Sequence, residues 1–100
     1  MTRDKAFALA LGLFCLSASA AELSHNEALE LRRKGELLPF ESILGLLSQR
    51  HPGFQIIEVE LESKANNYIY DIEIFTSGGQ IRELEIDARS GEVLDDEIDD

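Results

Sequence analysis

Ile57-Glu58-Val59-Glu60-Leu61-Glu62 alternates strictly between apolar and acidic residues. A period of two is typical of a strand with one face buried and the other in water. The same alternation recurs in residues 68–75 (YIYDIEIF) and 80–87 (QIRELEID). Residues 76–79 (TSGG) separate these two segments and contain the glycines that a hairpin loop favours. With a short last strand expected at residues 92–94, the sequence predicts an antiparallel meander of three to four strands.

Two helices are expected before the strands. Ser24 and Glu27 have the spacing of a capping box, which predicts a helix that runs to about Lys34. A second helix is expected from Pro39, with an apolar stripe at i, i+3, i+4 and i+7, namely Phe40, Ile43, Leu44 and Leu47. One face of the meander is apolar as well. We therefore predict an α+β fold in which the two N-terminal helices pack on one face of the antiparallel sheet.

The first twenty residues have the features of a secretory signal. Arg3 and Lys5 precede an apolar run at residues 6–16, and Ala18-Ser19-Ala20 fits the A-x-A pattern of signal peptidase sites. The run is too short to cross a bilayer as a helix, which needs about 20 residues. We expect residues 1–20 to be a cleaved signal peptide, with export to the periplasm and no membrane span.

Two alternatives for this segment are disfavoured. A buried core helix does not explain the charged start followed by an apolar run and a small-residue site. A lipoprotein is disfavoured because the bulky Phe14 precedes Cys15, where a small residue is expected. Cleavage removes Cys15, two basic residues and one acidic residue, so 80 residues with a net charge of −12 and no cysteine would remain. The mature domain would therefore contain no disulfide.

Composition limits the possible partners and the number of domains. The chain has 100 residues, with 20 acidic against 9 basic, which is enough for one small domain. The net charge of −11 disfavours nucleic acid and anionic membranes, since both attract basic surfaces. We expect the domain to cover residues 21–94. Residues 95–100 (DDEIDD) are expected to form a disordered acidic tail.

The sequence lacks a recognisable catalytic constellation. His25 lies in the first turn of a helix and His51 beside a helix-ending proline, so both are interpreted as surface or helix-end residues. Residues 87–92 resemble a calcium loop, but Arg89 occupies the third position, where an oxygen ligand is required. The prediction is a protein that is not an enzyme and that has no cofactor and no dedicated metal site.

The unusual feature is the outer face of the predicted sheet. If residues 77–79 form a three-residue loop, Glu73 lies opposite Glu83 on the neighbouring strand, and like charges in such pairs destabilise a sheet. Arg82 and Arg89 are the basic residues near in sequence, and parity directs Arg82 to the other face. By parity, eight acidic side chains project from the outer face: Glu58, Glu60, Glu62, Asp71, Glu73, Glu83, Glu85 and Asp87.

Two interpretations of this face remain open. It is either a solvated surface that resists edge aggregation, or a docking surface for a basic protein or for divalent cations. Ile69 and Phe75 share the face by parity and favour the docking interpretation. The edge of the strand at residues 54–61 offers a second docking site, where a partner could add a strand.

The ordered set of motifs resembles a PepSY domain. Its most specific part is Asp87-Ala88-Arg89-Ser90-Gly91-Glu92-Val93-Leu94, which fits the family's terminal hairpin, and Tyr70-Asp71-Ile72-Glu73-Ile74 fits its tyrosine-led strand. The resemblance covers nearly all of the chain after residue 20. Tyr70, Asp87 and Gly91 match family positions, and we interpret them structurally, as a core aromatic residue, a turn acid and a glycine with positive φ.

The resemblance implies a non-catalytic interaction module. PepSY domains occur in the propeptides of thermolysin-type metallopeptidases and in cell-envelope proteins. The expectation is therefore a periplasmic protein that binds and restrains or regulates an envelope protein, either as a peptidase inhibitor or as a modulator of a sensor. The alternative is an acidic, cation-responsive protein that binds divalent ions or cationic peptides through its carboxylate-rich sheet face.

Overall fold

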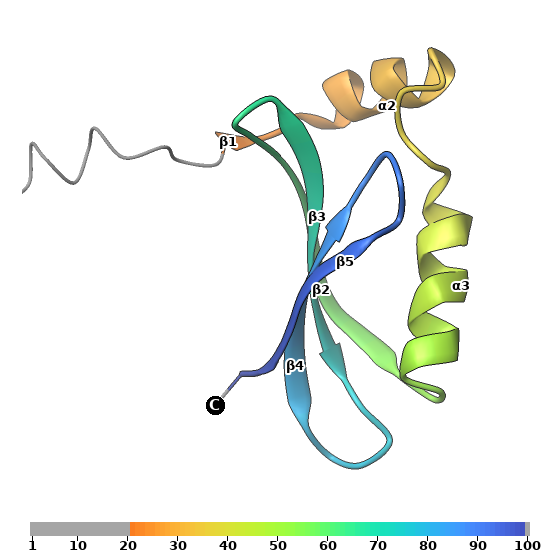
Figure 1. The fold of residues 1–100 in the computed structure, drawn as a ribbon, viewed down its shortest axis with the longest axis vertical. Coiled ribbons are helices and arrows are strands. Elements are labelled where there is room, and N and C mark those ends of the chain that lie inside the picture. The colour runs from red at the N-terminus through yellow and green to blue at the C-terminus, as the bar shows by residue number, and fades with distance from the viewer. Residues whose placement is uncertain (1–20, 100) are drawn as a thin grey trace, which may run out of the picture.

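The computed structural model describes residues 21–99 of the chain. The elements of this part are strand β1 (Ala21–Glu22), helices α2 (His25–Arg33) and α3 (Phe40–Arg50), and strands β2 (Gln55–Lys64), β3 (Asn67–Phe75), β4 (Ile81–Asp87) and β5 (Val93–Ile98). Both helices lie on the same side of the sheet (Figure 1). The fold is thus the predicted two-layer α+β arrangement. The expected signal peptide, residues 1–20, lies outside the described residues.

The sheet is antiparallel throughout and keeps the order of the chain, β1-β2-β3-β4-β5. The hairpin between β3 and β4 is closed by the backbone N–H of Thr76, which donates to the carbonyl of Gln80 at 2.8 Å. This loop sets the register that places Glu73 opposite Glu83 and Asp71 opposite Glu85. The prediction from the length of the loop is therefore confirmed.

Helix α2 begins where the sequence predicts, and α3 begins at Phe40, one residue after the predicted Pro39, which is its N-cap. Ser24 Oγ accepts from the backbone N–H of Glu27 at 3.1 Å, and Glu27 Oε1 accepts from the backbone N–H of Ser24 at 3.0 Å. This reciprocal capping box satisfies two N–H groups that a helix start leaves free. In α3, Ile43 and Leu47 of the predicted stripe are completely buried.

The core lies between the helices and one face of the sheet. The sheet contributes alternate residues of β3 and β4, as the period of two requires, namely Tyr70, Ile72, Ile74, Leu84 and Ile86. They pack in one cluster with Ala28 of α2 and with Ile43 and Leu47 of α3. Residues of the opposite parity therefore project from the face that the helices leave uncovered.

Two predictions about the sheet were wrong. It has five strands among the described residues and not three or four, because Ala21–Glu22 pairs with β2 and adds a strand at that edge. Residues 95–98 are also not a disordered tail, since they form most of β5 and pair with β4. The composition of this segment indicates disorder. The segment is ordered because its backbone pairs with β4 and because the carboxylate of Asp96, which points inward, forms ion pairs with Arg50 and Arg82.

Strand β2 departs from strict alternation. A bulge between Ile56 and Glu58 shifts the register with β3, and the extra residue, Ile57, is 48% exposed. Ile57 therefore does not join the core, although its place in the alternating pattern predicted a buried side chain. Within residues 21–99, no helix has the length and apolar character that crossing a membrane requires.

Candidate functional site

The eight predicted carboxylates do lie on one face of the sheet, and we call them the acidic face. They occupy neighbouring positions on three strands, because Glu58 pairs with Glu73 and Glu73 with Glu83 across the sheet. Glu60, Asp71 and Glu85 form a second such row. Like charges therefore stand directly opposite one another across both strand pairs, an arrangement that destabilises a sheet.

The structure adds acidic residues that the sequence pattern did not reveal. Asp95 lies opposite Glu85 and Glu97 opposite Glu83, so β5 extends both rows by one strand. At the opposite edge of the sheet, Glu22 of β1 pairs with Glu62. A regular alternation from β4 into β5 would have predicted that Asp95 and Glu97 extend these rows. A bulge in the β4–β5 pairing, between Glu85 and Ile86, interrupts that alternation, so the sequence pattern does not predict it.

Crowding of these carboxylates changes their proton affinity. Glu83 shares a side-chain hydrogen bond with Asp71, and this bond, with repulsion from Asp71, raises the pKa of Glu83 to about 7. The hydrogen bond with Asp99 raises the pKa of Glu73, and repulsion from Glu22 raises that of Glu60. Ionising all the carboxylates of the acidic face therefore costs free energy, because the negative charges repel one another. A cationic partner would reduce this repulsion.

The nearby basic residues mostly do not neutralise this surface. Arg82 points to the helix side of the sheet, as its parity predicts, and binds Asp96 there. The guanidinium of Arg89 lies 4.8 Å from the centre of the Tyr68 ring, and its Nη2 is 3.9 Å from a carboxylate oxygen of Glu36. Burial raises the pKa of Glu62, and the positive charge of the nearby Lys64 partly opposes this rise.

Asp87 differs from the other members of the acidic face. Its Oδ1 accepts from the backbone N–H groups of Arg89 and Ser90, at 2.8 and 3.0 Å. The bond from Ser90 is the main reason that the pKa of Asp87 is lowered. Asp87 therefore acts as the turn acid that the family motif predicts, and its carboxylate is partly engaged within the chain.

The other two motif residues are also structural. Tyr70 is 1% exposed, its ring centre is 5.5 Å from that of Phe40, and its hydroxyl accepts from Arg32 Nη2 at 2.6 Å. Gly91 has φ +82°, and a Cβ there would lie 2.9 Å from Cδ1 of Leu46. Both residues match the roles expected of them, a core aromatic residue and a glycine with positive φ.

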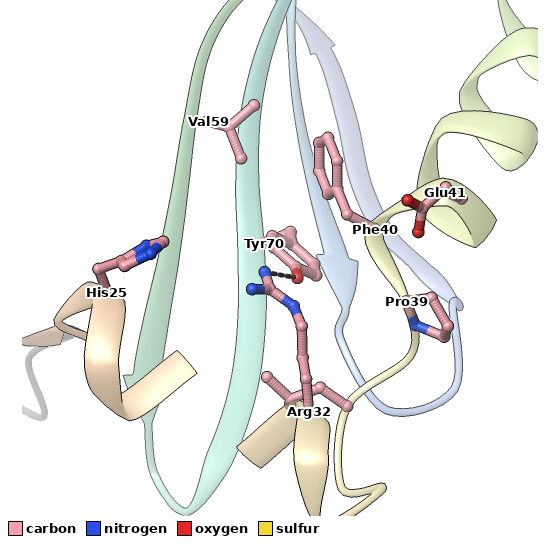
Figure 2. Close-up of a pocket in the computed structure, with 8 residues that line it drawn as sticks. His25, Arg32, Pro39, Phe40, Glu41, Val59 and Tyr70 are labelled. Carbon is pink, nitrogen blue, oxygen red and sulfur yellow. Dashed lines mark hydrogen bonds between the residues drawn. The ribbon is translucent and has the colours of Figure 1, made fainter. Parts of the chain in front are cut away.

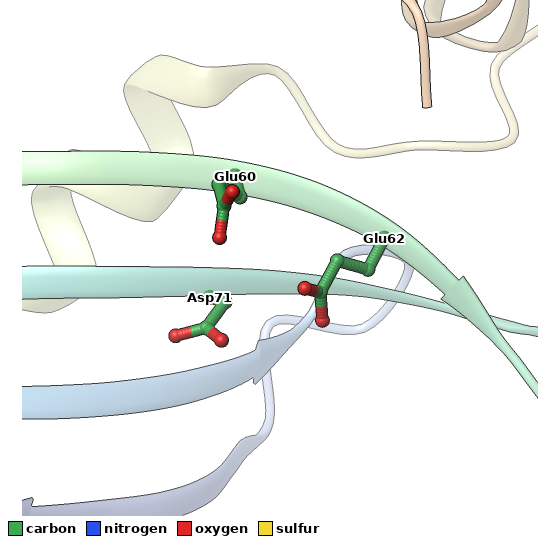
Figure 3. Close-up of side chains that lie close together, drawn as sticks. All are labelled: Glu60, Glu62 and Asp71. Carbon is green, nitrogen blue, oxygen red and sulfur yellow. The ribbon is translucent and has the colours of Figure 1, made fainter. Parts of the chain in front are cut away.

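Three carboxylates of the acidic face form a compact group. Glu60, Glu62 and Asp71 each bring a carboxylate oxygen to within 4.8 Å of the others, and Figure 3 shows them on the same side of β2 and β3. Beside them, a shallow depression of about 70 Å³ is lined by Glu58, Glu60, Asp71, Glu73 and Glu83. Oxygen ligands suit hard cations. Exposed acidic groups of this kind are common without an ion, so divalent-ion binding stays a prediction.

The apolar residues expected on this face behave differently from one another. Ile69 is only 7% exposed, so it does not contribute to a docking surface, contrary to the prediction. It is flanked by its cross-strand partners Glu62 and Asp87, on the two neighbouring strands. Phe75 is 43% exposed and pairs with the exposed Ile81 at the hairpin end of the acidic face. A small apolar patch therefore adjoins the carboxylates.

The two histidines lie away from the acidic face. His51 Nε2 donates to Asp96 Oδ2 at 2.9 Å, at the end of α3. His25 lines a cavity on the helix side of the sheet, which has a volume of about 530 Å³. Neither histidine lies on the acidic face. Each stands at the end of a helix, His25 at the start of α2 and His51 after the last residue of α3, as the sequence predicts.

Comparison with known proteins gives one match. The family model "Peptidase propeptide and YPEB domain", PepSY, matches residues 38–97. No curated protein and no solved structure matches the chain. The matched range begins just before α3 and ends within β5, so it contains the main packing helix and four of the strands described above. Because this range covers more than half of the chain, the protein belongs to the PepSY family.

Proposed function

We propose that the protein is a non-catalytic periplasmic module that binds and restrains or regulates a protein of the cell envelope. PepSY domains are generally propeptide or inhibitor-like modules, which supports a regulatory role. The observation that carries the proposal is the acidic face, where rows of carboxylates cross β2, β3, β4 and β5 with like charges opposite one another. Folding alone gains nothing from such rows, whereas a basic partner relieves their repulsion on binding.

The position of the acidic face also favours a docking role. The helices cover the opposite face of the sheet, so the carboxylates are open to a partner across the width of the sheet (Figure 1). Phe75 and Ile81 place exposed apolar side chains alongside the row that contains Glu73 and Glu83, at the hairpin end of the acidic face. A basic surface with an apolar element at its margin is the complementary partner, and steering by opposite charge would speed its encounter.

The test is capture from a periplasmic extract at physiological ionic strength, with residues 21–100 as bait. The wild type should retain a specific protein, and the variant Glu58→Lys/Glu60→Lys/Glu85→Lys should lose it. The control Glu30→Lys/Glu36→Lys/Glu92→Lys makes the same change in charge at exposed positions outside the acidic face and should retain it. If all three baits retain the same proteins, the acidic face is not the docking surface.

The purified partner then distinguishes restraint from other regulation. For a peptidase, the wild-type chain added in trans should slow cleavage of a protein substrate, and the triple variant of the acidic face should not. For the external domain of a sensor, the readout is its signalling output. The alternative, that divalent cations alone are the ligand, predicts no captured protein but a melting temperature that millimolar Ca²⁺ raises more than NaCl of equal ionic strength does.

A further inference from the structure

About half of β2 has no neighbouring strand on the side where β1 lies. Strand β1 pairs only with Ser63 and Glu62, and the N–H of Leu23 adds one bond to the carbonyl of Leu61 at 2.8 Å. Within residues 21–99, no other strand pairs with this side of β2, so residues 55–60 present free backbone groups. Ile56 and Ile57 are exposed there. A long edge strand with exposed apolar residues is a ready template for another strand.

The direction of the free backbone groups follows from the bond to Leu23. The carbonyl of Leu61 points to the β1 side, and backbone groups of alternate residues in a strand point to the same side. No register shift lies between Val59 and Leu61. The N–H and C=O of Val59 therefore point to the open edge, where an incoming strand can exchange both hydrogen bonds with it.

On the helix side, this edge adjoins a cavity. The cavity of about 530 Å³ is lined by Val59 of β2 and by residues of α2, α3 and their connection, and Figure 2 shows them around a common space. Leu37, Pro39 and Phe40 give it an apolar wall. Two charged residues also line it, Arg32 and Glu41, and the buried Nε of Arg32 has no hydrogen-bond partner. The apolar wall of the cavity thus favours an apolar side chain.

The other side of the same edge has the opposite preference. Glu58 and Glu60, which flank Val59 in sequence, belong to the acidic face. Glu60 is repelled by Glu22, Glu58 and Asp71. A side chain placed beside them is favoured if it is basic. The two sides of one strand edge therefore select different residue types at alternate positions.

We propose that the open edge of β2 binds an extended segment of the partner protein in which basic and apolar residues alternate. The segment pairs antiparallel to residues 55–60, with apolar side chains in the cavity beside Val59 and basic side chains beside Glu58 and Glu60. The proposal rests on the proposed function and names the docking mode and the partner's recognition element. Pairing of two copies through this edge is disfavoured, since it places Glu58 and Glu60 of one copy beside those of the other.

The test uses a short fluorescein-labelled peptide in which lysine and leucine alternate, with binding followed by fluorescence anisotropy. In antiparallel pairing, the residue that exchanges hydrogen bonds with Val59 lies on the same face as Val59, so it is a leucine. N-methylation of the leucine amides should therefore weaken binding more than tenfold. N-methylation of the same number of lysine amides, which point to solvent, should leave the affinity within about threefold. Any other order of the two affinities would overturn the proposal.

Two further arms separate strand addition from general attraction to acid. A peptide of the same composition with its lysines and leucines in blocks should bind at least tenfold more weakly. Glu60→Lys should weaken the alternating peptide strongly, and Glu97→Lys, on the other edge strand, only slightly. In hydrogen exchange, the alternating peptide should slow exchange of the Val59 amide. If the block peptide binds equally and the Val59 amide is unaffected, strand addition fails while docking on the acidic face stands.

Discussion

Arg82 Nε donates to Asp96 Oδ1 at 2.7 Å, across β4 and β5 and on the helix side of the sheet. The carboxylate of Asp96 is 7% exposed and also accepts from Arg50 Nε, at 2.7 Å, and from His51. One residue of the acidic C-terminal segment thus ties the end of α3 to the last two strands. Burial raises the pKa of Asp96, but the bonds from Arg50, Arg82 and His51 outweigh it and lower the pKa to about 2.

Replacing Asp96 should destabilise the fold. Asp96→Ala leaves the guanidinium of Arg82, which is mostly buried, without its carboxylate. We expect the free energy of unfolding to fall by about 2 kcal/mol, since removing one partner of a buried pair leaves an uncompensated charge. Urea denaturation measures this loss. The control Asp95→Ala removes a neighbouring acid that faces Glu85, and it should be neutral or slightly stabilising. An equal loss in both variants would contradict a specific role for Asp96.

Stability should depend on pH in a way set by Glu83. Its pKa is about 7 in the folded chain against an ordinary 4.5, so the folded state binds the proton more tightly. The resulting stabilisation is complete below about pH 4.5 and is lost as the pH rises through about 7. We expect it to reach about 1 kcal/mol, because water and salt screen this exposed group. Urea denaturation from pH 8 to pH 5 should show the rise, and Glu83→Gln should reduce it.

A fall in stability is expected at lower pH. The pKa of Asp96 lies below its ordinary value of 3.8, so the stability that Asp96 contributes is present above that value and is lost as the pH falls towards 2. The lowered pKa values of Asp87 and Glu27 act in the same direction. A curve that declines steadily from pH 8 to pH 5 would contradict the assignment to Glu83.

Gly91→Ala should destabilise the turn before β5 for two separable reasons. An alanine at φ +82° is strained by about 1 kcal/mol, and its Cβ would lie 2.9 Å from Leu46 Cδ1 and 3.3 Å from Leu38 Cδ1. The matched control is Gly79→Ala, because Gly79 has φ +83° but no atom within 4 Å of the added carbon. Thermal unfolding should show a larger loss for Gly91→Ala, by about 1 kcal/mol. Equal losses would mean that the side chain of Leu46 moves aside freely.

Tyr70→Phe should destabilise the core without changing its shape. The substitution removes the hydroxyl that accepts from Arg32 Nη2, and Arg32 Nε is already without a partner. We expect a loss of about 2 kcal/mol in the free energy of unfolding, as for a bond to a charged group. Tyr68→Phe, which keeps the ring under Arg89, is the control and should change stability little. A neutral Tyr70→Phe would show that water replaces the hydroxyl at Arg32.

Much of the fold and of the candidate site follows from local patterns in the sequence. The period of two predicts β2, β3 and β4, and the capping box predicts the start of α2 at His25. The three-residue loop after Thr76 determines the register, and the register alone places Glu73 opposite Glu83. Strand geometry repeats every two residues and a short loop leaves little choice of pairing, so these features need no information from distant residues.

Only the tertiary structure decided how the two edges of the sheet are used. The bulge between Glu85 and Ile86 resets the alternation, which turns Asp96 inward and brings Asp95 and Glu97 to the acidic face. Asp96 meets Arg50, 46 positions earlier, and no local pattern records such a contact. The short pairing of β1 likewise leaves the edge at Val59 open beside a cavity built from α2 and α3. Bulges and contacts between distant segments depend on packing of the whole chain, so the sequence pattern assigned Asp96 to a disordered tail while the fold buries it.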